Sequence, residues 1–220
     1  MAKLRVVVAD DELLYLDLLR LALSGHDGIE VVGTFPDGAK LLENVEQVKP
    51  DVAVLDVAFP QEPNGIEVGR ELKKRMPGLG IVLLSNHVNP AFVASLRRSR
   101  TPGWAYLDKK SVGDVDTLIR AIRGVVEGQV VLDPGILKRA EPRAGTAVAA
   151  LTERQREILE LIAQGFSNNA IAEALWLSPK TVENHINVLY QELGLRREAA
   201  YMPRVMAVLM YLDQTRFIEG

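Results

Sequence analysis

Short apolar runs alternate with amphipathic segments over residues 4–126 of the chain. The clearest run, at residues 52–55, has no polar alternation, which is typical of a strand buried on both faces of a parallel sheet. Comparable runs predict strands at residues 4–9, 29–33, 52–55, 81–84 and 104–107. The spacing of apolar residues between them predicts helices around 14–21 and at 37–46, 67–75, 90–98 and 115–126. Five alternations of strand and helix indicate one parallel sheet with helices on both faces.

The pattern changes after residue 128. Residues 129–148 contain prolines, glycines, several alanines and alternating charges, so we predict a linker there. It joins a first domain at 1–128 to a second at 149–220. The second domain shows helical patterns only, which makes the predicted fold class α/β plus all-α.

Helix-start signals divide the second domain into about four helices. Thr152 and Gln155 fit a capping box, and Ser167 is placed to cap a short second helix. Ser178 followed by Pro179 begins a third helix, with small polar residues on its outer face. Two short helices, a tight turn and such a third helix are typical of a helix-turn-helix. A fourth helix is predicted at 201–213.

Composition narrows the class of protein without naming a partner. The net charge of -3 gives no basic signature for nucleic-acid binding. The chain has no cysteine, which excludes disulfides and thiolate metal sites. Its N-terminus has too few apolar residues for a signal peptide, and no apolar run approaches the roughly 20 residues of a membrane span. We therefore expect a cytoplasmic protein with no membrane partner.

Polar side chains follow four of the predicted strands. They are Asp10, Asp11, Asp56, Ser85 and Lys109. Because the carboxyl ends of parallel strands meet at one edge of a sheet, these residues should share one crevice. Three crowded carboxylates repel unless a cation neutralises them, and hard oxygen ligands suit Mg²⁺ (or Mn²⁺). One carboxylate could then act as a nucleophile towards phosphorus. Taken alone, Asp56 could equally cap the loop that follows it.

These strand ends resemble a response-regulator receiver domain, which implies a flavodoxin-like (βα)5 doubly wound sheet. The resemblance implies that Asp56 accepts a phosphoryl group from a sensor histidine kinase. It further implies that Asp10, Asp11, Asp56 and the backbone carbonyl of Ala58 hold Mg²⁺. Phosphoryl binding and switching would fall to Ser85, Lys109 and Tyr106. The loop after Pro60 has one residue more than usual before Gly65, and Asn86 follows Ser85 where a small residue is usual.

The stretch from Leu151 to His185 resembles a LuxR-type DNA-binding domain, so the whole chain resembles a NarL/FixJ-type two-component response regulator. This implies a transcription regulator that binds double-stranded promoter DNA and forms a homodimer when active. By resemblance, the DNA contacts are Lys180, Thr181, Asn184, His185 and Asn187, with His185 alternatively a residue at the edge of the core. The fourth helix, with Val205, Val208, Leu209 and Leu212, would mediate dimerisation.

The charge of the second domain leaves alternatives open. Residues 151–195 carry three basic and six acidic side chains, although phosphate contacts supply much of the affinity for DNA. An atypical regulator that acts through a protein partner, or independently of phosphorylation, is one alternative. A Mg²⁺-dependent phosphohydrolase is another, disfavoured by the helix-turn-helix. We expect no enzymatic activity in this protein other than removal of its own phosphoryl group.

Overall fold

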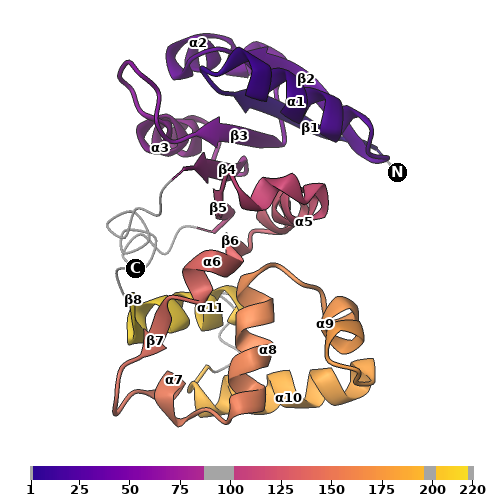
Figure 1. The fold of residues 1–220 in the computed structure, drawn as a ribbon, viewed down its shortest axis with the longest axis vertical. Helices are drawn as coiled ribbons and strands as arrows, with labels where there is room; N and C mark the ends of the chain where they lie inside the picture. Colours follow the sequence, from indigo (N-terminus) through magenta and orange to yellow (C-terminus); the bar gives the residue numbers. More distant parts are fainter. Residues whose placement is uncertain (1, 87–101, 196–201, 218–220) are drawn as a thin grey trace. The chain divides into compact units, whose positions relative to one another are not determined.

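The structure, a computed structural model, describes residues 2–86, 102–195 and 202–217. The chain divides into two compact units: the first comprises Met1–Val88 and Gly103–Gly128, and the second includes Gln129–Gly220. Figure 1 labels their elements. The helix predicted at 90–98 lies outside the described residues. No described helix is long and apolar enough to cross a membrane.

The first unit is built on parallel strands in the order β2-β1-β3-β4-β5. Their bounds are β1 (Leu4–Ala9), β2 (Ile29–Phe35), β3 (Val52–Asp56), β4 (Gly80–Ser85) and β5 (Trp104–Asp108). This order reverses between β1 and β3, as in flavodoxin-like folds. Every residue of β3 and β4 is buried, which is why their sequences lack polar alternation.

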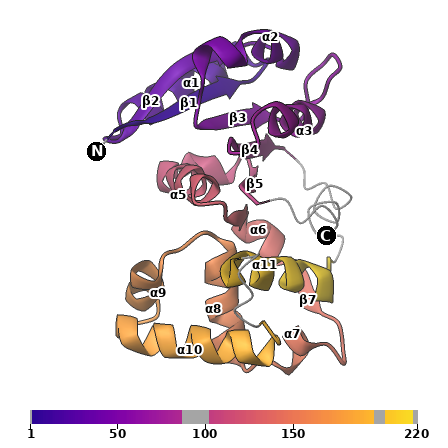
Figure 2. The ribbon, with the colours of Figure 1, turned by 180° about the vertical axis from the view of Figure 1, so that it is seen from behind.

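Helices cover both faces of these strands. Their bounds are α1 (Leu13–Ser24), α2 (Gly38–Val48), α3 (Gly65–Arg75) and α5 (Val115–Val126), with a short 3₁₀ turn η1 at Ser111–Gly113. α1 contacts α5, and α2 contacts α3. Right-handed crossovers place these two pairs on opposite faces, and Figures 1 and 2 show the arrangement from front and back. The predicted doubly wound sheet is confirmed.

The start of α3 differs from the prediction because a capping box determines it. The sequence indicated a helix starting at residue 67, but α3 starts at Gly65. Asn64 accepts hydrogen bonds from the backbone of Ile66 and Glu67, and the Glu67 side chain accepts one from the Asn64 backbone. This capping box satisfies the free N–H groups of the first turn and fixes where α3 begins.

The second unit is mainly helical, with α8 (Glu153–Ala163), α9 (Asn168–Ala174), α10 (Pro179–Glu192) and α11 (Pro203–Gln214). Three side chains cap the starts of the first three helices: Thr152, Ser167 and Ser178 each accept a hydrogen bond from the backbone N–H three residues on. α8, α9 and α10 contact one another around a shared apolar core. The predicted helix-turn-helix is therefore present.

The segment predicted as a linker contains regular structure. It includes β6 (Val130–Leu132), α6 (Pro134–Leu137), β7 (Ala140–Pro142) and α7 (Ala147–Ala150). β7 pairs antiparallel with β8 (Thr215–Phe217) near the end of the chain. Val130, Leu132, Leu137 and Val148 are buried in the core of the second unit, so their apolar side chains outweigh the proline and glycine content that suggested a linker.

The role predicted for the fourth helix is wrong. Val205, Val208, Leu209 and Leu212 were predicted as a dimer contact, but each is buried within the second unit. α11 packs on α8, α7 and β6, elements that include the segment taken for a linker. Because these elements cover the apolar stripe of α11, its side chains form core in a single chain.

Candidate functional site

Three carboxylates meet at the carboxyl ends of β1 and β3. Asp10 and Asp11 follow β1, and Asp56 ends β3, which is paired with β1 so that Ala9 lies opposite Leu55. One carboxylate oxygen from each of the three lies within 4.8 Å of the others. Asp10 and Asp56 are buried, whereas Asp11 keeps contact with solvent. The strand register thus assembles the predicted acidic cluster.

Lys109, just beyond β5, joins this cluster. Its Nζ lies 2.9 Å from Asp10 Oδ2 and 3.2 Å from Asp56 Oδ2, and its backbone N–H donates to the carbonyl of Ser85 at 2.8 Å. Burial alone would lower the pKa of Lys109, but the hydrogen bond that it donates to Asp10 and the charges of both carboxylates raise it overall. The ammonium therefore stays charged between the two buried carboxylates.

The donor set fits a hard divalent cation. With Glu12, whose Oε1 lies 3.5 Å from Lys109 Nζ, three carboxylates contact one ammonium, and Asp11 adds a fourth carboxylate to the cluster. Burial raises the pKa of Asp10, against the opposing effect of its hydrogen bond with Lys109. The excess of negative charge on oxygen ligands is the environment that Mg²⁺ neutralises in proteins.

The other predicted site residues of the first unit lie around this cluster. Ser85 ends β4 and is buried, one position beyond Leu84, which pairs with Asp56. Tyr106 in β5 is 1% exposed, so its ring lies inside the unit. The backbone N–H of Ala58 donates to Asp56 Oδ1 at 3.2 Å, which holds the loop after β3 against that carboxylate.

Gly65 closes the loop that follows Asp56. Its N–H donates to the carbonyl of Val57 at 3.1 Å. A Cβ at this position would lie 2.8 Å from the carbonyl carbon of Asp56 and 3.0 Å from Val57 Cα. The start of α3 therefore packs directly on the backbone of Asp56, and only glycine permits that approach.

Sequence reasoning missed Tyr15, in the first turn of α1. Lys109 Nζ lies 4.7 Å from the centre of its ring, a cation–π contact. The hydroxyl is buried and finds no hydrogen-bond partner among the described residues, and burial raises the pKa of Tyr15 to about 12. Its position four residues after Asp11 on a predicted helix was the available signal, since that spacing turns it back towards the strand ends.

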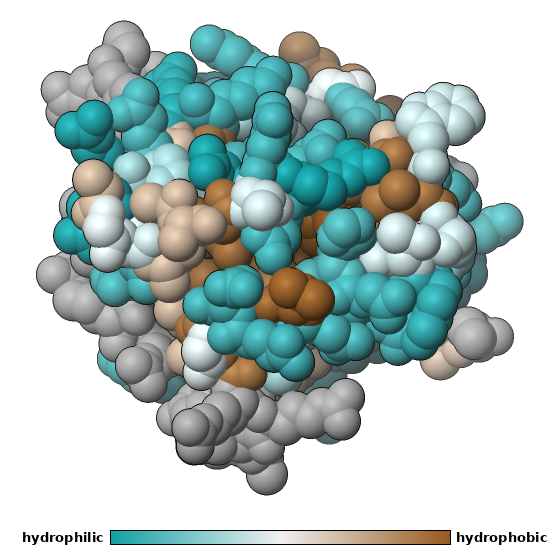
Figure 3. Space-filling model, turned by 90° about the horizontal axis from the view of Figure 1, so that it is seen from below, coloured by the Kyte–Doolittle hydropathy of each residue, from teal (hydrophilic) through white to brown (hydrophobic). Residues whose placement is uncertain are grey.

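The second predicted site lies along α10. Lys180, Asn184 and Asn187 are exposed, and Thr181 and His185 are half-buried beside them. Val182, Ile186 and Leu189 form the buried side of the helix. The five predicted contact residues thus lie outside the core. One of them, Lys180, forms an ion pair with Glu183, with its Nζ 2.9 Å from Glu183 Oε2. Figure 3 views the molecule from the side on which α10 lies in Figure 1 and shows a mostly hydrophilic surface with scattered apolar patches.

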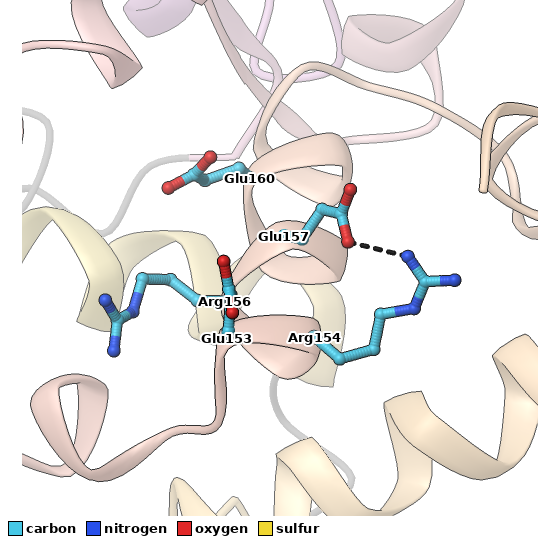
Figure 4. A pocket seen from close by; sticks show the side chains of 5 residues that line it. All are labelled: Glu153, Arg154, Arg156, Glu157 and Glu160. Atoms are coloured by element: carbon cyan, nitrogen blue, oxygen red, sulfur yellow. Dashed lines mark hydrogen bonds and ion pairs between the residues drawn. The ribbon is translucent and has the colours of Figure 1, made fainter.

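α8 carries a charged face and supports the turn before α10. Arg154 pairs with Glu157 at 2.6 Å and also donates to the carbonyl of Leu175, in the α9–α10 turn, at 3.0 Å. Figure 4 shows Arg154 and Arg156 pointing to opposite sides of α8. These residues, with Glu153 and Glu160, line an open hollow of about 450 Å³.

Both units match protein-family models. Residues 6–123 match the response regulator receiver domain, and residues 149–202 match the bacterial regulatory proteins of the luxR family. A probable transcriptional regulatory protein NarL of Mycobacterium tuberculosis is 32% identical over 208 residues, which cover 93% of this chain and 94% of that protein. The DNA-binding transcriptional activator DevR/DosR of the same species is 31% identical over 202 residues, covering 87% of this chain and 88% of that protein.

Solved structures show the same fold. The response regulator ChrA of a heme-sensing two-component system has a TM-score of 0.50 and 27% identity, covering 97% of this chain and 98% of that chain. RcsB of Salmonella typhimurium has a TM-score of 0.51 at 24% identity, covering 97% and 99%. With a receiver domain followed by a LuxR-type domain over nearly the whole length of such relatives, the chain belongs to the two-component response regulators of the NarL/FixJ type.

Proposed function

We propose that Asp56 accepts a phosphoryl group from a sensor histidine kinase, and that this switches DNA binding by the second unit. The observation that carries the proposal is the buried Lys109 ammonium held 3.2 Å from Asp56 and 2.9 Å from Asp10. In the transfer, a carboxylate oxygen of Asp56 bonds to phosphorus as the phosphorus–nitrogen bond of a phosphohistidine breaks. The imidazole leaves and takes up a proton.

The residues suited to Mg²⁺ (or Mn²⁺) are Asp10, Asp11, Asp56 and the backbone carbonyl of Ala58. When bound, such an ion neutralises the cluster and withdraws charge from a phosphoryl oxygen. Lys109 is placed to pair with another phosphoryl oxygen, because its ammonium already lies beside Asp56. Ser85, at the end of the neighbouring strand, offers a hydroxyl to the same group.

The switch we propose runs from Ser85, at the end of β4, to Tyr106 in the adjacent strand β5, where Tyr106 pairs with Leu83, two residues before Ser85. Movement of Ser85 towards a phosphoryl group changes the packing around the buried Tyr106 ring, which gives the receiver two states. Apart from hydrolysing its own phosphoaspartate, the protein is expected to have no enzymatic activity.

The kinase must cover the strand ends to deliver its phosphoryl group. α1 begins directly after the acidic loop and exposes an apolar stripe: Leu14, Leu18 and Leu21 are 77%, 54% and 60% exposed. Exposed apolar stripes of this kind are typical of protein-binding surfaces, and the position of this one beside Asp11 supports contact with a phosphate donor. We assign this stripe to the kinase.

For the second unit we propose binding of α10 in the major groove of promoter DNA, by a homodimer when active. Support comes from the outward polar residues of α10 and from the relative DevR/DosR, whose name describes a DNA-binding transcriptional activator. The buried stripe of α11 leaves dimer contacts to other surfaces.

The direct test of the phosphoacceptor is intact mass measured after incubation with Mg²⁺ and a small phosphate donor. Wild type should gain one phosphoryl group, and Asp56→Asn, which removes the nucleophilic oxygen while keeping the shape, should gain none. Equal labelling of the two proteins would refute the assignment of Asp56.

A further inference from the structure

Trp176 occupies an unusual position in the turn between α9 and α10. Its side chain is 95% exposed, while Trp104, the other tryptophan of the chain, is 3% exposed. Its backbone is in the left-handed region, with φ of 56°. A bulky residue is disfavoured there, because its Cβ crowds the backbone. Neither burial nor backbone preference explains a tryptophan at this position.

The hydrogen bonds of the turn show which residue type would suit it. Leu177 N–H donates to the carbonyl of Ala172 at 2.9 Å, and Trp176 N–H donates to the carbonyl of Glu173 at 3.3 Å. This pair of bonds is a Schellman motif with Trp176 at the left-handed position, which glycine usually fills. Glycine would preserve both bonds, so the indole serves no purpose in ending α9.

The turn nevertheless holds the backbone of Trp176 firmly. Leu175 and Leu177, on either side of Trp176, pack against the core of the second unit. Arg154 reaches from α8 to donate to the carbonyl of Leu175 at 3.0 Å. A large aromatic side chain on a fixed backbone loses little conformational freedom when it binds, which is the property of residues that dominate interfaces.

We propose that Trp176 is a contact to the sugar–phosphate backbone of duplex DNA. The inference rests on the proposed DNA binding by α10. Trp176 lies two residues before Ser178, the cap of α10, and the start of a recognition helix is the part that enters the major groove. The turn therefore borders one backbone of that groove, where the indole face packs on deoxyribose and the indole N–H donates to a phosphate oxygen.

The charge of the helix-turn-helix itself, residues 151–195, favours such a contact. Residues 151–195 carry twice as many acidic as basic side chains, and Lys180, at the start of α10, is paired with Glu183. Few cations are available to release counterions from DNA, the usual source of affinity. An uncharged contact that combines apolar packing with one hydrogen bond adds affinity without a positive charge.

The test is Trp176→Gly in the full chain, because this substitution separates the fold from binding. Glycine relieves the left-handed strain, so the melting temperature of the variant should equal or exceed that of wild type. Affinity for fluorescein-labelled 30-base-pair duplexes, one from the upstream region of the gene and one of random sequence, should fall about 5- to 20-fold. The slope of affinity against salt should stay unchanged, because no ionic contact is lost.

A second readout follows Trp176 itself. Since Trp104 is buried, acrylamide quenching of tryptophan fluorescence reports mainly on Trp176, and addition of duplex DNA should protect it. Equal DNA affinity of Trp176→Gly and wild type, or quenching that DNA leaves unchanged, would overturn the contact. So would a melting temperature more than about 5 °C below wild type, which would show a role in the fold. A wild-type chain that binds neither duplex, with and without beryllofluoride, would instead refute the proposed DNA binding.

Discussion

Replacement of Gly65 by alanine should damage the phosphoacceptor site without touching a charged residue. The new Cβ would overlap the carbonyl oxygen of Asp56 and lie 2.8 Å from its carbonyl carbon, whereas ordinary contacts of a Cβ are at 3.4 Å or more. The start of α3 or the end of β3 must therefore move. Forced overpacking of this kind costs about 1–3 kcal/mol of stability.

The same movement displaces Asp56 from Lys109, which is 3.2 Å away. Because misplacement of reacting groups by about 1 Å can cost on the order of 100-fold in rate, we expect Gly65→Ala to slow phosphorylation by at least 10-fold. The assay is the time course of intact mass with Mg²⁺ and a small phosphate donor. Gly78→Ala is the matched control, since a Cβ there meets nothing within 4 Å. A wild-type rate for Gly65→Ala would refute the packing argument.

Three further predictions test other parts of the structure. Tyr15→Phe removes a buried hydroxyl without a partner among the described residues, so it should raise the free energy of unfolding by about 1 kcal/mol. Tyr15→Leu also removes the ring under Lys109 and should lower the free energy of unfolding by about 1 kcal/mol. The opposite order of the two variants in chemical denaturation would contradict the contact between Tyr15 and Lys109. Burial lowers the pKa of Lys73 to about 8, so between pH 8 and pH 10 the unfolded chain holds more protons than the folded chain. The free energy of unfolding should therefore rise by about 1 kcal/mol over this range, after allowance for partial exposure of the lysine. The same rise in Lys73→Met would exclude this lysine as its source. Leu212→Ala should destabilise the second unit by about 3 kcal/mol, whereas a change in oligomeric state alone, by light scattering, would return α11 to the role of a dimer helix.

The receiver site could be predicted from the sequence because the lengths of the apolar runs indicate strands, and the polar residues of the site come directly after those runs. Apolar runs that end in Asp56 or Ser85 place those residues at strand ends, and a parallel sheet brings strand ends together whatever the loops do. The helix caps at Thr152, Ser167 and Ser178 were equally local signals, and all three are present.

Features that depend on tertiary partners could not be predicted in this way. The stripe of α11 is the same pattern for a core helix and a dimer helix, and only the packing of residues 130–150 against it decides between them. The spacing of Tyr15 from Asp11 directs it towards the strand ends, but its contact with Lys109 joins α1 to a residue beyond β5, three strands away from β1 in the sheet, and no local pattern encodes that partner. The left-handed backbone of Trp176 was hidden because tryptophan is not a residue that signals such a turn.

Phosphorylation of Asp56 should control DNA binding through α10. Fluorescence anisotropy with duplex DNA from the upstream region of the gene measures this link, for wild type and Asp56→Asn, with and without beryllofluoride and Mg²⁺. Beryllofluoride should tighten binding by wild type and leave binding by Asp56→Asn unchanged. Tight binding by wild type that is indifferent to beryllofluoride would contradict this link.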